Sequence, residues 1–323
     1  MSSNLKVACL GGGHGLFQTL RASRLLDTES ITAVVTVADD GGSSGRLRRE
    51  FRGLIPPGDL RMALAALAGD DESSQMWAST LQHRFGGTGA LAGHAVGNLL
   101  IAGLTESLGT EQAALDEIAT LMNSRGRVVP MAGEPLDIEA EVAGLDDDPR
   151  VMRAVRGQVS VATTPGQVRR VRLIPDDVDA NPLAIEAIRN ADLVTLGPGS
   201  WFSSVIPHLL IPSIVEAIAQ SSAQRVVVLN LTPEPGETAG FSAERHLHML
   251  RQHAPELQMD WVLMDESTMP SASEQHYLAR AAELFGAKLA VAGLREVDDR
   301  GRAVGRHDPA KLSAAFQRLA GER

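Results

Sequence analysis

Short apolar runs, separated by a glycine turn and by helical periodicity, set the pattern at the start of the chain. Residues 5–10 and residues 31–38 are apolar runs too short for helices and typical of buried strands. Between them lies a glycine turn, 11–15, followed by Leu16 and Leu20 at helical spacing. A strand, turn, helix and second strand form a βαβ unit, which requires a parallel sheet with a right-handed crossover.

The same rhythm returns in the second half of the chain. Apolar runs predict strands at 192–196 and 226–231. Pro207 and Pro212 are expected to break one of the later helices, because proline lacks the backbone N–H that a helix interior needs. Helices are predicted where apolar residues recur every three or four positions, over residues 59–68, 93–107, 110–122, 182–190, 203–220 and 309–319.

Residues 128–174 have a different pattern of apolar and charged positions. Every second residue from Leu136 to Val142 is apolar and its neighbours are charged, as in a strand with one solvated face. We interpret 128–174 as a small, mainly antiparallel β insertion. The chain as a whole, 1–323, is predicted to be a single α/β domain.

Composition excludes several classes of function. Hydrophobic residues make up 44% of the chain and charged residues 22%, which is ordinary for a globular protein. The formal net charge of −10 and the aromatic content of 3% argue against binding to nucleic acid or to a membrane surface. The single cysteine, Cys9, lies in the first apolar run, which excludes disulfides and thiolate metal sites. No apolar run approaches transmembrane length, so we expect a cytoplasmic protein without membrane insertion.

The second apolar run leads into a stretch that carries acidic, glycine, serine and basic residues together. Its candidate ligand-binding residues are Asp39, Asp40, Gly41, Ser43, Ser44 and Arg46. The carboxyl end of a parallel strand is where open α/β sheets bind ligands, so we predict a binding loop here. The two aspartates could accept a ribose hydroxyl or hold Mg²⁺ against phosphates, with Asp40 as the candidate metal ligand. The alternative is a solvated turn whose serine caps a helix.

The glycine turn 11–15 can bring backbone N–H groups close to an anion at a helix N-terminus. Gly12, Gly13 and His14 are its candidate contacts. The third glycine position of the dinucleotide fingerprint is Leu16, and the Lys-Ser/Thr pair of a Walker loop is absent. The turn therefore predicts phosphate binding without specificity for a nicotinamide cofactor, and its alternative is a tight strand-to-helix connection.

Four further candidates lie in the predicted helices. Asp59 precedes a helix and is either an N-cap or a ligand contact, and Arg61 could reach a phosphate or cover a surface. His94 and Asn98 are four residues apart and are expected to share one helix face. His94 is a candidate general acid/base or phosphate donor, or a structural histidine. No second histidine or cysteine has zinc-ligand spacing with it.

A second glycine turn follows the strand at 192–196. Gly197, Gly199 and Ser200 are candidate anion contacts there, and Asn230 stands near the end of the next strand. Two such turns predict a ligand with two ends that lies across the carboxyl edge of the sheet. This turn is not a Gly-x-Ser-x-Gly elbow, and Ser200 lacks an obvious base, so hydrolase chemistry is not indicated there.

Together these motifs resemble those of the YvcK-type gluconeogenesis factors of bacteria, which share a superfamily with 2-phospho-L-lactate transferase, CofD. The loop that begins at Asp39 is the most specific of the matching features. An Arg-His-Asp sequence like that at Arg306 also closes the chain in YvcK-type proteins, which makes Arg306 a candidate arm to the diphosphate or sugar of a ligand. The matching stretches are 11–16, 35–47, 56–61, 93–101, 196–200 with 204–207, and 230–238.

The resemblance implies a Rossmann-like three-layer α/β fold with a mainly parallel sheet, and a homodimer. It implies a UDP-sugar such as UDP-GlcNAc as ligand, and a regulatory role in gluconeogenic growth, cell shape and cell-wall precursor supply. The alternative is a phospholactate-type transferase that uses Mg²⁺, a nucleotide-diphosphate-linked donor and a deazaflavin acceptor. Both hypotheses stand at this point, because a transferase of this kind works by positioning and charge stabilisation, which a binding protein also provides.

Overall fold

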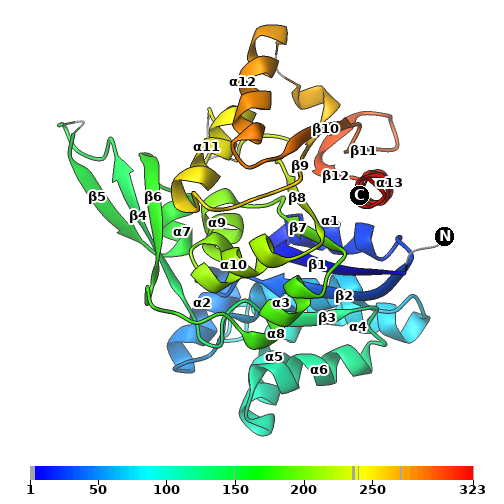
Figure 1. Ribbon diagram of the computed structural model, residues 1–323. Helices are drawn as coiled ribbons and strands as arrows, with labels where there is room; N and C mark the ends of the chain where they lie inside the picture. The colour runs from blue at the N-terminus through cyan, green and yellow to red at the C-terminus, as the bar shows by residue number, and fades with distance from the viewer. Residues whose placement is uncertain (1–3, 149, 235–236, 239, 270, 323) are drawn as a thin grey trace.

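The computed structural model describes residues 4–148, 150–234, 237–238, 240–269 and 271–322. Its centre is a seven-stranded sheet in the order β10-β9-β8-β7-β1-β2-β3, in which every neighbouring pair is parallel (Figure 1). The strands of this sheet are β1 (Leu5–Gly11), β2 (Thr28–Val35), β3 (Arg127–Pro130), β7 (Leu193–Leu196), β8 (Gln224–Val228), β9 (Trp261–Asp265) and β10 (Lys288–Ala292).

Helices cover the sheet in the manner of a doubly wound fold. Right-handed crossovers place α1 and α3 on one face of the sheet and α8 and α10 on the other, and the last helix, α13, returns to the first face. Accordingly, α1 packs against α3 and α13, whereas α8 packs against α10. The helices are α1 (Gly13–Ser23), α2 (Gly42–Glu50), α3 (Pro57–Leu67), α4 (Glu72–Gln82), α5 (Val96–Leu108), α6 (Glu111–Leu121), α7 (Gln158–Ala162), α8 (Pro182–Arg189), the π-helix η1 (Trp201–Val205), α9 (Ile206–Leu209), α10 (Pro212–Gln220), α11 (Ala243–His253), the 3₁₀-helix η2 (Glu266–Thr268), α12 (Ala272–Glu283) and α13 (Pro309–Ala320).

The sheet changes its direction of growth at β1. The chain adds β2 and β3 on one side of β1 and then returns to add β7, β8, β9 and β10 on the other. The gap between the carboxyl ends of β1 and β7 is therefore the topological switch point, where open α/β sheets bind ligands. The predicted α/β fold with a mainly parallel sheet is confirmed.

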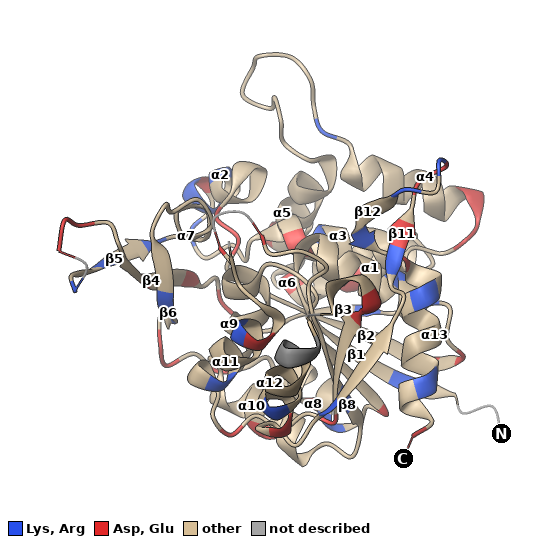
Figure 2. Cartoon of the chain, turned by 90° about the horizontal axis from the view of Figure 1, so that it is seen from above, with Lys and Arg blue, Asp and Glu red and all other residues tan. Residues whose placement is uncertain are grey.

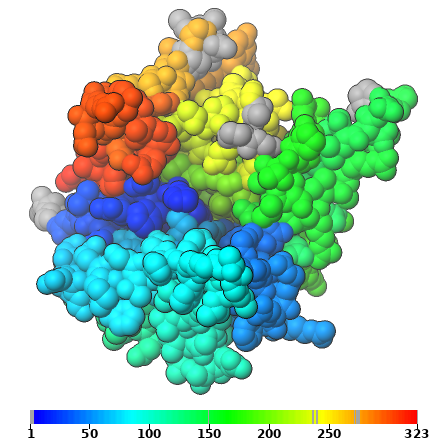
Figure 3. Space-filling model, turned by 180° about the vertical axis from the view of Figure 1, so that it is seen from behind, coloured from blue at the N-terminus to red at the C-terminus, as the bar shows by residue number. Residues whose placement is uncertain are grey.

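A separate antiparallel sheet, which we call the wing, projects from the body (Figures 1 and 3). Its order is β5-β4-β6, with β4 at Asp137–Ala143, β5 at Met152–Arg156 and β6 at Gln167–Ile174. The apolar side chains of β4 are buried, while its acidic side chains form ion pairs with arginines of β5 and β6. Figure 2 shows these acidic and basic residues interspersed on the wing. The predicted start of the insertion, residue 128, falls inside β3 of the main sheet.

Several predicted boundaries were wrong, each for a local reason. The strand predicted at 31–38 ends at Val35, because β1, its pairing partner, ends at Gly11. The helix predicted from Asp59 starts at Pro57, and Pro56 is its N-cap, so Asp59 lies in the first turn. Proline suits that first position, because its N–H is not needed there.

Three further elements differ from the sequence-based expectations. The helix predicted from residue 93 begins at Val96, so His94 precedes it. The stretch after Asp40 is the start of α2, which the patterning missed, and its N-cap is Gly41 rather than a serine. The short hairpin of β11 (Arg295–Val297) and β12 (Ala303–His307) was also missed.

The helix predicted at 203–220 is broken, as its prolines indicated. It consists of η1, α9 and α10, with an axis bent by 71° between Leu209 and Pro212. Within the described residues no single helix is long and apolar enough to cross a membrane, although this bent pair passes by length and composition. Its large side chains, such as Trp201 and Ile214, are buried in the core of the protein.

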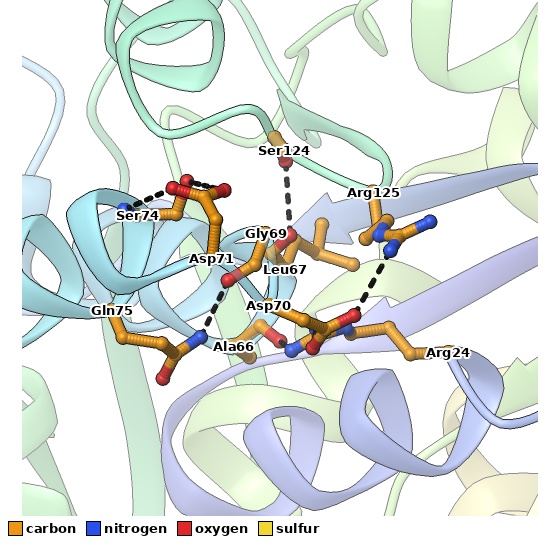
Figure 4. A network of polar contacts seen from close by, with 10 residues as sticks. All are labelled: Arg24, Ala66, Leu67, Gly69, Asp70, Asp71, Ser74, Gln75, Ser124 and Arg125. Atoms are coloured by element: carbon orange, nitrogen blue, oxygen red, sulfur yellow. Dashed lines mark hydrogen bonds and ion pairs between the residues drawn. The ribbon is translucent and has the colours of Figure 1, made fainter.

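A polar network joins helix ends at the amino-terminal edge of the sheet (Figure 4). Arg24, which caps the C-terminus of α1, donates to the carbonyl of Ala66 at 3.1 Å and also to Asp70. Arg125, just before β3, donates to the same carboxylate at 3.0 Å. Asp71 accepts the N–H of Ser74 at 2.9 Å and caps α4. These contacts hold three helices together at the edge opposite the predicted ligand site.

A buried histidine links η1 and α9 to the sheet and should make stability depend on pH. His208 is fully buried, and its Nε2 lies 3.0 Å from the Val34 carbonyl oxygen. Burial lowers the pKa of His208 to about 4. The unfolded chain therefore takes up a proton near pH 6.5 that the folded chain refuses, and the free energy of unfolding should fall as the pH drops from about 6.5 towards about 4.

We predict that His208→Gln, whose amide can still donate to Val34, makes this dependence shallower by up to about 1.4 kcal/mol per pH unit. The measurement is urea unfolding of wild type and variant at a series of pH values. His83→Gln, which removes an exposed histidine, is the matched control and should leave the slope unchanged. An identical slope in His208→Gln and wild type would show that His208 does not couple folding to protonation.

Candidate functional site

Loops from both halves of the chain meet at the carboxyl edge of the sheet. The turn after β1 opens α1, the loop after β2 opens α2, and the loops after β7 and β8 come from the other side of the switch point. The first turn of α3 lies beside the loop after β2. This edge brings together residues that the sequence analysis selected from widely separated stretches.

The N-terminus of α1 is suited to an anion. Its N-cap, Gly12, has no side-chain hydrogen bond, and the first turn holds no acidic residue. A Cβ atom on Gly15 would lie 2.0 Å from the carbonyl oxygen of Pro198, so only glycine allows the two turns to approach so closely. His14 is exposed at the mouth of this turn. The carboxylate of Asp59 lies at this N-terminus: it accepts the N–H of Gly13, and its Oδ2 is 2.5 Å from the position of a Cβ on Gly12. The backbone N–H groups and the helix dipole therefore favour negative charge at the switch point.

Asn230 fixes the second glycine turn. Its Oδ1 accepts the N–H of Gly199 at 2.9 Å, and its Nδ2 donates to the carbonyl of Gly199, also at 2.9 Å. Both ends of the amide are thus used on one backbone unit. In this structure Asn230 positions Gly199 opposite α1, together with Gly197, whose φ of 77° favours glycine.

Acidic and basic side chains share a cavity of about 200 Å³ below the loop after β2. Asp39 Oδ1 accepts the N–H of Gly41 at 2.9 Å. A Cβ on Gly58 would lie 2.4 Å from Asp39 Oδ2, which shows how closely α3 approaches this carboxylate. Arg61 is buried in the same cavity and donates from Nε to Asn98 Oδ1 at 2.9 Å.

The charges in this cavity are incompletely neutralised. Burial, and then the negative charge of Asp39, raise the pKa of Asp59 to about 7. Burial also raises the pKa of Asp39. Burial, and then the neighbouring Arg84, lower the pKa of Arg61 to about 10. Perturbed groups of both signs gathered in one cavity are typical of functional sites.

His94 and Asn98 do not share a helix face, contrary to prediction, because His94 lies before α5. They nevertheless meet at the start of α2. His94 Nδ1 lies 2.9 Å from Ser43 Oγ, and Asn98 Nδ2 donates to Ser44 Oγ at 3.5 Å. Burial lowers the pKa of His94, which favours its neutral form. These contacts hold the first turn of α2 against α5.

Asp40 and Arg46 contact neighbouring segments rather than the cavity of Asp39. Asp40 Oδ1 accepts the N–H of Val159 at 2.9 Å, and this bond joins the loop after β2 to α7 beside the wing. Arg46 Nη2 donates to the carbonyl of Ala92 at 2.9 Å. The two adjacent aspartates therefore have different surroundings.

The sequence analysis missed two acids in the loop after β8. Glu237 is buried, and it accepts a hydrogen bond from Ser200, from Ser203 Oγ at 3.0 Å and from the N–H of Phe202 at 3.1 Å. Glu234 is half-buried nearby. Their position after a strand was a usable signal, but it was read only as a turn. Pro235 and Gly236 of the same stretch lie outside the described residues.

Arg306 lies on β12 at the rim of a second cavity, of about 260 Å³, which His14, Gly199, Asn230 and Glu234 also line. It donates from Nε and Nη2 to the carboxylate of Glu296, at 3.0 and 2.8 Å. The hairpin that the patterning missed thus carries Arg306 to the switch point. Its guanidinium already makes a two-pronged contact with a carboxylate.

A pair of acids at this site, Asp39 and Asp59, suits Mg²⁺ better than the predicted metal ligand, Asp40. Asp39 and Asp59 present hard oxygen atoms to one cavity, and their mutual repulsion would be relieved by a divalent cation completed by phosphate or water oxygens. Asp40 does not line this cavity, and its Oδ1 accepts the N–H of Val159. In the described part of the chain, no group of three or more His, Cys, Asp or Glu side chains is arranged to hold a metal ion.

Known proteins resemble this chain over almost its whole length. The model of the CofD family, described as 2-phospho-L-lactate transferase CofD, matches residues 7–300. A Mycobacterium tuberculosis homologue whose name refers to gluconeogenesis factors is 56% identical over 96% of this chain and 89% of its own length. The gluconeogenesis factor of Bacillus subtilis is 36% identical over 97% of this chain and 98% of its own.

The fold is also similar to that of solved structures. The crystal structure of a UPF0052 family member from Bacillus halodurans has a TM-score of 0.83 and 35% identity, over 96% of this chain and 98% of that one. Sequence similarity and fold therefore lead to the same assignment. The chain belongs to the CofD family, and the gluconeogenesis factors are its homologues.

Proposed function

We propose that this protein binds a nucleotide sugar, such as a UDP-sugar, and acts in the cytoplasm as a regulatory factor for gluconeogenic growth, cell shape and cell-wall precursor supply. The observation that carries the proposal is the N-terminus of α1, where the carboxylate of Asp59 accepts the N–H of Gly13, beside the turn that Asn230 fixes around Gly199. A diphosphate fits at the N-terminus of α1, because the helix dipole and the backbone N–H groups of the first turn favour an anion there. The names of the homologues support the regulatory part.

The cavities on either side of this gap support a ligand with two ends. On one side lies the cavity of Asp39, Asp59 and Arg61, and on the other the cavity of Glu234 and Arg306. Carboxylates accept hydrogen bonds from hydroxyl groups, which the ribose and the sugar of a nucleotide sugar both carry. A nicotinamide dinucleotide is less well supported, because Leu16 replaces the third glycine of its fingerprint.

A phospholactate-type transferase is the second candidate. The description of the family model favours it, as does the pair of acids Asp39 and Asp59, which would hold Mg²⁺. A bound Mg²⁺ would supply charge stabilisation for a transferred phosphoryl group. Against this candidate stands the loop 39–46, whose resemblance is to the YvcK-type branch.

We predict that a UDP-sugar stabilises the folded protein and that NAD does not. A ligand present at a hundred times its Kd should add about 2.7 kcal/mol to the free energy of unfolding. The measurement is a thermal-shift screen of UDP-GlcNAc, other nucleotides, NAD and the deazaflavin, each with and without Mg²⁺. Stabilisation by NAD alone would overturn the proposal.

We predict no transfer of phospholactate to a deazaflavin acceptor. The assay incubates the protein with a nucleotide-linked phospholactate donor, the deazaflavin and Mg²⁺, and detects the product by mass spectrometry. A 2-phospho-L-lactate transferase run in parallel shows that the assay works. Product above the level of a reaction without protein would favour the second candidate.

We predict that Arg306→Lys loses most of the affinity for the UDP-sugar although it keeps the positive charge. A guanidinium can grip a phosphate with two N–H groups in a fixed plane, as it grips Glu296 here, and an ammonium cannot. Calorimetry measures the two affinities, and Arg302→Lys on the same hairpin loop, paired with Asp298, is the matched control. Unchanged affinity in Arg306→Ala would remove this residue from the site.

A further inference from the structure

The cavity of about 260 Å³ beside the switch point is lined by groups of opposite character. The first turn of α1, with His14 and Gly15, and Arg306 of β12 lie on its anion-attracting side. The loop after β8 contributes Glu234. A ligand in this cavity therefore meets positive potential on one wall and a carboxylate on another.

Glu234 has no basic partner within the described residues, where no ion pair includes it. Its side chain is hydrogen-bonded to Ser200. Burial, and then the charge of Glu237, raise its pKa to about 7. The backbone of Glu234 is fixed separately, since its N–H donates to Thr238 Oγ1 at 2.8 Å and its carbonyl accepts the N–H of Thr238 at 3.0 Å.

The other charged or titratable groups at this cavity do not neutralise Glu234. Glu237 is negative and is held by Ser200, Ser203 and the N–H of Phe202. Arg306 is paired with Glu296. Burial lowers the pKa of His307 to about 4, so this histidine is neutral, and His14 is exposed at the rim.

We infer that Glu234 determines specificity for the group attached to the ligand's diphosphate, and this inference rests on the proposed function. Its carboxylate accepts hydrogen bonds from the hydroxyl groups of an uncharged sugar and repels a further phosphate in the same place. The protein would then distinguish a UDP-sugar from UTP, although both carry the same nucleoside and diphosphate. The diphosphate itself lies against α1, where the N–H groups are.

The pH should modulate this discrimination. Above pH 7 Glu234 is mainly ionised, and it rejects the terminal phosphate of UTP. Below pH 7 it is mainly protonated, so the repulsion is lost while the carboxyl group can still hydrogen-bond to a sugar hydroxyl. The ratio of the two affinities should therefore be larger at pH 8 than at pH 6.

The test is calorimetry of UDP-GlcNAc, UDP and UTP at pH 8 and pH 6, at one fixed Mg²⁺ concentration. It compares wild type, Glu234→Gln and the control Glu256→Gln, which removes one negative charge at an exposed position. At pH 8 we expect wild type and the control to bind UTP about tenfold or more weakly than UDP-GlcNAc. In Glu234→Gln this ratio should fall several-fold and lose most of its pH dependence. Titration of the nucleotide phosphates affects all three proteins alike.

Each outcome has a distinct meaning. If UDP-GlcNAc binds but the UTP ratio is the same in Glu234→Gln and wild type, Glu234 has no role in specificity, and the proposed function stands. If none of the three nucleotides binds wild type, the proposed function fails, and this inference fails with it. Should Glu234→Gln not fold, Glu234→Ala, which removes the same charge, replaces it in the same comparison, and a UTP ratio equal to that of wild type overturns the inference.

Discussion

The contact between two glycine turns at the switch point is the constraint on which the rest of the site depends. The carbonyl of Pro198 reaches the position that a side chain on Gly15 would occupy, and Asn230 locks Gly199 in place beside it. A larger residue at Gly15 would force β1 and β7 apart at their carboxyl ends. The loops that carry the acids and the arginines are arranged around this contact.

Positive and negative charges lie at different places along the carboxyl edge of the sheet. The carboxylate of Asp59 lies at the N-terminus of α1, where it accepts the N–H of Gly13, and Glu234 lines the cavity on the other side. Both acids have raised pKa values. Keeping such acids partly buried lowers stability at neutral pH, because the folded state disfavours their ionised forms. A ligand or a cation that interacts with these acids would offset this loss of stability.

Sequence patterning predicted four of the seven parallel strands, β1, β2, β7 and β8, because their apolar runs are long enough to require burial on both faces. It assigned β3 to the insertion and did not predict β9 or β10 as strands. It selected residues that lie at the site, but it did not predict which of them contact one another. His94, Ser43 and Asn98 were each selected, yet their contact depends on α5 packing against α2, which no local pattern encodes. Likewise α2 begins at Gly42 with φ of 45°, and glycine is a poor helix former, so the local sequence does not indicate a helix start there. The polar hairpin that carries Arg306 has too little apolar alternation to stand out.

The position of β1 beside β7 has a consequence for folding while the protein is synthesised on the ribosome. The N–H of Lys6 is bonded to Asp192, 186 residues later in the chain, so the first strand cannot complete its pairing until more than half of the polypeptide has been made. The two turns of the switch point, the amide of Asn230 that fixes one of them, and Arg306 on β12 come together only after Arg306 has been made. Non-local pairing of this kind folds slowly. Ligand binding would thus mark the completed chain, and truncated products of translation would not compete for the ligand.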